Sequence, residues 1–185
     1  MDIHFKNYTH LSRSENEELL TIRNSDNIRK NSKDDKVILI EEHLNWLESL
    51  KSTTDSLYYA IIVDGEMVGG VNAFRMDVKS AYWGVFFKDN LNPLISPVAV
   101  YLFIDKMFKR RGFRLLNSEV NINNAGAASF NTSLGFLHSS YFDENGIRYA
   151  HFTLLKSDWE DGKSRKNTIK NIAKQLLKIN FKFST

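Results

Sequence analysis

The sequence predicts one mixed α/β domain built around a single central sheet. Two dipeptides of the type that turns β-hairpins, Asp64-Gly65 and Asn145-Gly146, each lie between two strand-like runs rich in aromatic and β-branched residues. Between these hairpins, residues 80–136 alternate strand-like and helix-like segments. A length of 185 residues suits one domain with its own core.

The first part of the chain is expected to hold a short strand over residues 3–8 and two helices. Residues 15–24 form the first helix and residues 40–51 the second. On the second helix, the residues at helical spacing on one face are Ile40, His43, Leu44, Leu47 and Leu50.

The middle of the chain is expected to form most of the sheet. Gly84 interrupts one strand, where a glycine often marks a bulge or a close backbone approach. The following helix has Ser96 as its N-cap, Pro97 in its first turn and Gly112 at its end. The expected strands are 57–63, 67–74, 80–87, 115–121, 136–142 and 147–155, and the expected helices are 97–111 and 125–134.

The last thirty residues differ in charge from the rest. Residues 1–155 hold 17 Lys/Arg and 19 Asp/Glu, whereas residues 156–185 hold 8 and 3. We therefore expect a domain over 1–155 and a basic extension over 156–185, with an amphipathic helix over 164–177. Its apolar side is formed by Ile169, Ile172, Ala173, Leu176 and Leu177. This helix could dock on its own chain, pair in a homodimer or lie on an anionic membrane, and the first two are favoured.

Composition excludes several classes of protein. The chain has no cysteine, so a thiol in the chemistry must arrive on a cofactor. Its five histidines show no metal-binding spacing, and no metal is expected. Basic residues gathered in the tail argue against a nucleic-acid partner. Without a long apolar run or a signal-peptide pattern, the expected location is cytoplasmic.

The strand and helix on either side of residues 88–96 suggest a site for a phosphorylated thioester. A helix that begins directly after a loop presents backbone N–H groups and a positive dipole end, which suits a pyrophosphate. A bulge near Gly84 would leave strand N–H groups free for a thioester carbonyl and the oxyanion that develops on it.

Several residues give the chain a family resemblance. Asn124, Ala127 and Phe130, followed by Gly135-Phe136, resemble the N-x-x-A-x-x-(L/F)-x-x-x-x-G-F ending of the GNAT acetyltransferases. Over about residues 15–155 the chain resembles more closely the amino-sugar N-acetyltransferases of the pseudaminic acid pathway. That likeness is carried by Arg23-Asn24, His43 within EEHLNWLESL, Tyr82-x-Gly84, Glu119-Val120 and Asn123-Asn124.

The resemblance implies a GNAT-like acyl-CoA N-acyltransferase fold with acetyl-CoA as cofactor. The pyrophosphate would lie on residues 92–96 and the start of the following helix, and the pantetheine arm along residues 85–87. The implied cofactor-binding residues are Val85, Phe86, Phe87, Leu94, Ile95, Ser96, Val98, Ala99, Asn124, Ala127, Phe130 and Asn131. The implied substrate-binding residues are Arg23, Asn24, His43 and Tyr82.

Two departures from the family pattern stand out. The phosphate loop of the family is glycine-rich, whereas the stretch DNLNPLISP has no glycine. Many relatives have a tyrosine acid where this chain has Asn131, which can only donate a hydrogen bond to the departing sulfur. Loss of the acid is tolerable because a CoA thiolate is a good leaving group.

The reaction needs a base, because an amine attacks only when it is neutral. Glu119 is the first candidate and His43 the second. Each has a plainer interpretation: Glu119 as a carboxylate facing solvent, and His43 as a hydrogen-bonded core histidine. Arg23 could likewise form a surface pair with Asp26, and Tyr82 could be an ordinary strand aromatic.

The sequence thus predicts an acetyl-CoA-dependent N-acetyltransferase acting on a small amine, with a nucleotide-linked amino sugar as the leading substrate. An acetyltransferase for a protein N-terminus or another small amine is the alternative enzyme. A GNAT-fold binding module with impaired CoA binding is the alternative of another class, and the glycine-free loop favours it.

Overall fold

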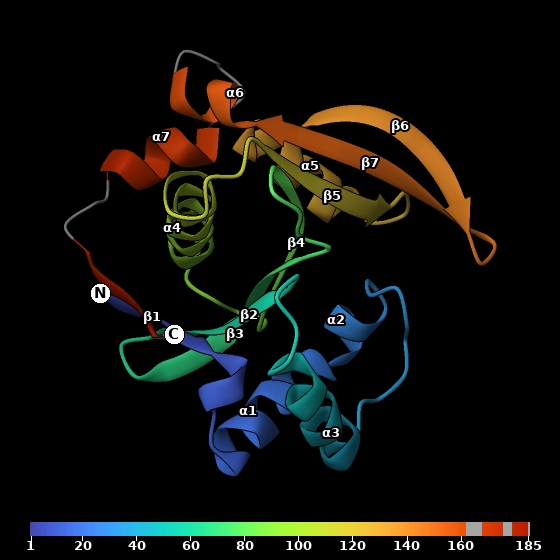
Figure 1. The fold of residues 1–185 in the computed structure, drawn as a ribbon, viewed down its shortest axis with the longest axis vertical. Coiled ribbons are helices and arrows are strands. Elements are labelled where there is room, and N and C mark those ends of the chain that lie inside the picture. The colour runs from blue at the N-terminus through green and yellow to red at the C-terminus, as the bar shows by residue number, and fades with distance from the viewer. Residues whose placement is uncertain (162–167, 176–178, 185) are drawn as a thin grey trace. The chain divides into compact units, whose positions relative to one another are not determined.

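A computed structural model describes residues 1–161, 168–175 and 179–184 of the chain (Figure 1). These residues form two compact units. The first contains residues 1–74, 84–96 and the C-terminal strand, and the second contains residues 75–83 and 97–175. In the chain, the boundaries between the units fall after Phe74, Trp83 and Ser96.

The first unit is built on four strands in the order β3, β2, β1, β8. These are β1 (Asp2–Asn7), β2 (Leu57–Val63), β3 (Glu66–Phe74) and β8 (Asn180–Ser184). β1 and β2 pair antiparallel, as do β2 and β3, while β8 runs parallel to β1. Asp64 and Gly65 both adopt positive φ, as the predicted two-residue turn requires.

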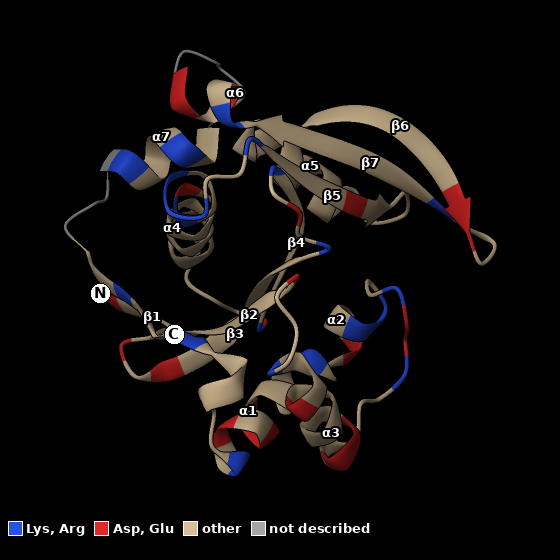
Figure 2. Cartoon of the chain, viewed as in Figure 1, with Lys and Arg blue, Asp and Glu red and all other residues tan. Residues whose placement is uncertain are grey.

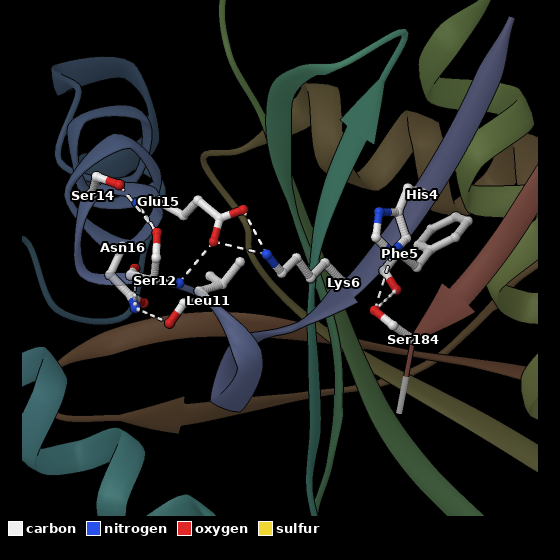
Figure 3. Close-up of polar contacts among 9 residues, drawn as sticks. All are labelled: His4, Phe5, Lys6, Leu11, Ser12, Ser14, Glu15, Asn16 and Ser184. Atoms are coloured by element: carbon white, nitrogen blue, oxygen red, sulfur yellow. Dashed lines mark hydrogen bonds and ion pairs between the residues drawn. The ribbon is translucent and has the colours of Figure 1, made fainter.

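Strand β8 was not predicted, and its side chains explain why it pairs with β1. The rings of Phe5 and Phe183 stack at 4.2 Å between centroids, and His4 Nε2 lies 3.0 Å from Ser184 Oγ (Figure 3). A five-residue strand with exposed positions gives little periodicity in the sequence, and only its long-range partner reveals it.

Helices α1 (Arg13–Arg23), α2 (Asp26–Arg29) and α3 (Ile40–Leu50) complete the first unit, with a 3₁₀ turn over Tyr8–His10. α1 begins two residues earlier than predicted because Ser12 and Glu15 form a capping box (Figure 3). The Ser12 N–H donates to Glu15 Oε2 at 2.7 Å, and the same carboxylate pairs with Lys6 on β1 at 2.7 Å. The cap thus also ties α1 to the strand.

The second unit has strands in the order β4, β5, β7, β6. β4 (Ser80–Phe87) pairs parallel with β5 (Leu115–Asn121) over its first residues, and the latter half of β4 belongs to the first unit. β5 pairs antiparallel with β7 (Ile147–Leu155), and β7 with β6 (Leu137–Glu144). Asn145 and Gly146 form the predicted turn with positive φ at both positions.

Helix α4 (Ile95–Lys109) starts before the predicted Pro97, so Ser96 lies inside the helix and is not its N-cap. Asn92 is the reason: its side-chain oxygen accepts the Leu94 N–H at 3.0 Å, and its carbonyl accepts the Ile95 N–H at 3.0 Å. Pro97 is tolerated in this first turn because N–H groups there have no partner within the helix. Helix α5 (Ala125–Leu134) is as predicted and ends at Gly135, whose φ is 97°.

The tail folds differently from the expected single helix. An unpredicted helix, α6 (Lys156–Asp161), buries Trp159 against Tyr101, and α7 (Thr168–Gln175) contacts α5. On α7, whose lysines Figure 2 shows, Ile169 and Ala173 are buried while Ile172 is 39% exposed. The remaining positions of the predicted helix, 164–167 and 176–177, lie outside the described residues. The described part of α7 therefore packs on its own chain.

Within the described ranges, no helix combines the length and the apolarity that crossing a bilayer requires. No group of three or more acidic or histidine side chains in these ranges could hold a metal ion.

Candidate active site

A cavity of about 500 Å³ lies within the first unit, in the size range of small-molecule sites. Its walls come from the 3₁₀ turn, α1, α3, the loop before α3 and strands β2 to β4. The lining residues are Tyr8, Leu19, Leu20, Arg23, Ile38, Glu42, His43, Trp46, Tyr58, Gly70, Val71, Asn72 and Phe86. We call this cavity the aromatic pocket.

Three large rings meet in the aromatic pocket. Trp46 and Tyr58 lie edge to face at 4.8 Å between centroids, and Tyr8 lies 5.7 Å from Tyr58. Gly70 allows this arrangement, because a Cβ there would collide with the Tyr8 hydroxyl and the Phe86 ring. The sequence analysis predicted no functional role for Gly70 or for the three rings. The Gly69-Gly70 pair inside a strand was the available signal.

Arg23 supplies the positive charge of the pocket. Its Nη1 is buried and has no hydrogen-bond acceptor among the residues that the structure describes. Burial lowers the pKa of the guanidinium, and the charges of Tyr8 and, to a smaller extent, Asp34 raise it. The surface pair with Asp26 does not form, since Asp26 pairs with Arg29 at 3.1 Å. Arg23 therefore presents an N–H group that a buried anionic oxygen would satisfy.

His43 lines the pocket, is 5% exposed and packs its ring against Trp46. Its Nε2 lies 2.9 Å from Asn16 Oδ1. The Asn16 amide nitrogen donates to the carbonyls of Leu11 and Ser12 (Figure 3). Asn16 Oδ1 is therefore the acceptor, and His43 Nε2 carries a hydrogen. Burial lowers the pKa of His43, which keeps the ring neutral at pH 7.

The other two predicted substrate residues lie elsewhere. Asn24 is not among the lining residues, because its amide exchanges two hydrogen bonds, of 2.9 and 3.0 Å, with the backbone of Ile38. It holds Ile38, which does line the pocket. Tyr82 belongs to the second unit, where its ring lies under the guanidinium of Arg75. The structure thus brings Arg23 and His43 together but not Asn24 or Tyr82.

The predicted cofactor residues of the first unit lie on β4 and the loop after it. Gly69 of β3 allows close approach of the Phe86 backbone, with which a Cβ would collide. A Cβ at Gly84 would lie 2.8 Å from Asn72 Oδ1, so the group that approaches this glycine is a side chain and not the backbone that was predicted. In the glycine-free loop, Asn90 adopts a φ of 56°. Asparagine tolerates this left-handed conformation, so it makes a turn that glycine would otherwise make.

The predicted cofactor residues of the second unit include two asparagines with distinct tasks. Asn124 caps α5 by accepting the Ala127 N–H at 3.0 Å. Asn131 is 4% exposed and donates through Nδ2 to the Ala127 carbonyl at 3.0 Å. Its buried Oδ1 has no donor among the described residues. Asn131 therefore offers an acceptor at Oδ1 in addition to the donor that was predicted, because the amide nitrogen carries two hydrogens and the Ala127 carbonyl takes one.

Glu119 lies on β5 with a side chain only 9% exposed, so it is not a solvent-facing carboxylate. Its Oε1 is 3.2 Å from Arg75 Nη1. Arg75 has a φ of 48° in the loop between β3 and β4, and its guanidinium also lies 5.3 Å from the centre of the Tyr82 ring. The second unit thus holds an ion-paired carboxylate of low exposure, supported by an aromatic ring.

Comparisons with known proteins agree with this architecture. No protein-family profile matches the chain. The acetyltransferase PseH of Campylobacter jejuni is 27% identical over 156 residues, which are 84% of this chain and 96% of PseH.

Two solved structures show the fold. The N-acetyltransferase PseH of Campylobacter jejuni in complex with acetyl coenzyme A matches with a TM-score of 0.65 and 22% identity, over 83% of this chain and 99% of that chain. The spermidine N-acetyltransferase of Vibrio cholerae in complex with CoA and spermine matches with a TM-score of 0.74 and 13% identity, over 85% and 98%.

The mixed α/β architecture is that of the GNAT acetyltransferases, which confirms the predicted fold. Taken with the curated relative, it shows that the chain resembles N-acetyltransferases in fold and, over most of its length, in sequence. The particular protein that the chain resembles over most of its length is PseH.

Proposed function

We propose that this chain transfers the acetyl group of acetyl-CoA to the amino group of a nucleotide-linked amino sugar bound in the aromatic pocket. The observation that carries the proposal is Arg23, which lines a pocket of aromatic rings and whose buried Nη1 has no acceptor among the described residues.

An anionic substrate group would satisfy Arg23. A buried donor without a partner costs about 1–3 kcal/mol, and more when the group is charged. Phosphate oxygens accept such hydrogen bonds strongly. Trp46, Tyr58 and Tyr8 offer faces and edges on which a base or a sugar ring can pack. A nucleotide sugar combines both features, and the resemblance to amino-sugar acetyltransferases supports the same class.

A polyamine fits this pocket poorly. A polycation needs several carboxylates, and the described lining contains one, Glu42. Glu42 already accepts the Leu39 N–H through Oε2 at 3.2 Å. Arg23 would repel a polyamine from the same cavity. The chain therefore shares the fold of the spermidine enzyme but not the charge that a polyamine site needs.

The cofactor is acetyl-CoA, which supplies a thioester carbon for the amine to attack. In the first unit, the resemblance assigns its binding to the backbone of residues 85–87 and to the loop with Asn90 and Asn92. In the second unit, it assigns binding to the first turns of α4 and to Asn131. The unsatisfied acceptor on Asn131 supports this assignment. Strand N–H groups would stabilise the oxyanion.

Glu119 would take the proton of the attacking amine, directly or through water. It is preferred over His43 for two reasons. The Nε2 hydrogen of His43 is engaged by Asn16, and the ring is packed against Trp46. Glu119 has a carboxylate held in a defined position by Arg75.

The test of the substrate class is a panel of acceptors assayed with acetyl-CoA. Nucleotide amino sugars are expected to be acetylated, while spermidine and peptides are not. Arg23→Gln should raise KM for the sugar nucleotide about 10–100-fold with little change in kcat, because it removes a binding contact rather than a reacting group. Arg13→Gln is the matched control, since Arg13 lies on the same helix and pairs on the surface with Glu17 and Glu41. Turnover of spermidine or peptides alone would refute the sugar assignment.

Acetyl-CoA binding is tested separately by thermal shift. A ligand that binds only the folded state raises Tm with concentration. A shift is expected at micromolar acetyl-CoA. No shift at millimolar acetyl-CoA would favour a GNAT-fold binding module over an enzyme.

A further inference from the structure

Around Glu119, the proposed base, one face of the second unit holds polar side chains that the proposed chemistry has not used. Glu119 of β5 and His151 of β7 are directly opposite in the antiparallel ladder, so their side chains share a face and their Cβ atoms lie about 5 Å apart. Tyr82 is paired with Asn117, two residues before Glu119, and shares that face. Its ring centroid lies 5.9 Å from that of His151.

Ser139, at the register shift of β6, fixes the position of the hydrogen on His151. Its Oγ lies 2.8 Å from His151 Nδ1 and 3.0 Å from the His151 carbonyl oxygen. The hydroxyl has one hydrogen, and the carbonyl can only accept it. Both contacts are satisfied together only if Oγ–H donates to the carbonyl and Nδ1–H donates to Oγ. The lone pair of the neutral ring then lies on Nε2.

The Nε2 atom of His151 is buried and has no hydrogen-bond partner among the residues that the structure describes. A buried basic nitrogen without a donor is uncommon and needs an explanation. The titratable and charged groups nearest to the ring are Glu119 from β5, Tyr82 from β4 and, through its contacts with both, Arg75. From β6 the neutral Ser139 hydroxyl faces Nδ1.

We propose that His151 is a positioning residue that relays the amine proton from Glu119 to solvent, with Ser139 as its exit. The inference rests on the proposed acetyl transfer with Glu119 as base. The Arg75 guanidinium stabilises the negative charge of Glu119, so the carboxylate is restored when it passes the proton on. Ser139 is exposed, and a proton that reaches it can leave to water.

The relay balances without any other reactant. The amine nitrogen forms a bond to the acetyl carbon, the carbon–sulfur bond of the thioester breaks, and the sulfur leaves with the bonding electron pair. The amine proton binds Glu119 and then His151 Nε2, directly or through one water. The imidazolium loses its Nδ1 proton through Ser139 to solvent, and the thiolate of the product is protonated from solvent. The ring is then the Nε2–H tautomer, and proton exchange with solvent after product release restores Nδ1–H for the next turnover.

The kinetic test compares His151→Gln with His138→Gln. His138 lies on β6 and packs its ring on Tyr141 and Phe152. It is the matched control, because none of these ring contacts involves Glu119. His151→Gln should lower kcat about 10–100-fold, with KM values near wild type. It should also remove one ionisation from the pH profile of kcat, which His138→Gln retains. Equal profiles in His151→Gln and wild type would overturn the relay.

The spectroscopic test does not depend on activity. Nitrogen-15 spectra of the histidine rings should show His151 as the Nδ1–H tautomer in the wild type, and Ser139→Ala should shift the ring toward Nε2–H. An Nε2–H tautomer in the wild type would overturn the relay. Failure of the proposed function would give a different result: the protein would neither bind acetyl-CoA nor transfer acetyl groups, although His151 would still be the Nδ1–H tautomer. That result would also overturn the relay, because the relay rests on acetyl transfer.

Discussion

The aromatic pocket of the first unit and the polar face of the second unit differ in how their charged groups are arranged. In the pocket, one buried cation lies among rings, and its histidine has its Nε2 hydrogen bound by Asn16. On the polar face, formed by Glu119, Arg75, His151 and Ser139, the Glu119 carboxylate pairs with the Arg75 guanidinium, and His151 lies opposite Glu119 in the ladder and contacts Ser139. Desolvation gives the pocket affinity for a complementary ligand, whereas paired titratable groups suit proton transfer. Binding and chemistry should therefore respond to different substitutions.

The largest effect is expected from Glu119→Gln. The amide cannot accept the amine proton, so kcat should fall about 10²–10⁴-fold, while the thermal shift produced by acetyl-CoA stays near wild type. Glu160→Gln, an exposed carboxylate in the same unit, is the control and should retain full activity. A wild-type pH–rate profile in Glu119→Gln would assign the base elsewhere.

Gly70→Ala should damage the pocket and spare the polar face. The added methyl group would collide with the Tyr8 hydroxyl and the Phe86 ring, so KM for the acceptor should rise at least tenfold and the protein should lose about 1–3 kcal/mol of stability. Gly126→Ala is the control, since the nearest atom to its Cβ would be at 3.7 Å. An unchanged acceptor KM in folded Gly70→Ala would remove the pocket from substrate binding.

Ser12→Ala tests the N-cap of α1, a helix that lines the pocket, rather than a lining residue. It removes the hydroxyl that accepts the Glu15 N–H at the start of α1, at a cost of about 1 kcal/mol in unfolding free energy. Chemical denaturation measures the change. Thr21→Ala, on the exposed face of the same helix, should cost clearly less, and an equal loss in both variants would argue against the cap.

The smallest effect concerns pH and His43. Burial lowers its folded pKa below the unfolded value near 6.5, so the unfolded state binds more protons. Its contribution to stability is full above about pH 6.5 and is lost as pH falls through the folded pKa. The Tm should therefore drop between pH 7.5 and pH 5, and by less in His43→Gln. An equal drop in both proteins would show that His43 does not titrate on unfolding.

Local chemistry made the regular elements predictable. Asp64-Gly65 and Asn145-Gly146 turn both hairpins because these residues accept positive φ. β2, β4, β5 and α5 have the predicted bounds, since alternation, helical spacing and Gly135 mark their limits. The predicted start of α4 at Pro97 was wrong, because the Asn92 side chain accepts the Leu94 N–H and the helix begins earlier, at Ile95. Strand β8 was missed because its order comes from β1, 180 residues away in the chain.

The site was predictable only in part. Arg23, His43 and Glu119 were identified from motif positions, but their roles depend on neighbours from other elements. Asn16 decides which ring nitrogen of His43 carries a hydrogen, and Arg75 pairs with Glu119 from a loop 44 residues earlier. His151 and Ser139 belong to no motif. The ladder register places His151 opposite Glu119, and Ser139 contacts His151.

The amino-acid sequence by itself determined the alternation of strands and helices, the two hairpin turns and the likeness to GNAT acetyltransferases, because these depend on spacing and on backbone preferences of single residues. Only the tertiary structure decided that Arg23 faces a pocket, that Asn24 does not, and that Glu119 is shielded beside Arg75. Burial and pairing are properties of several distant residues together, and a one-residue shift in register would reverse the face of every side chain on a strand.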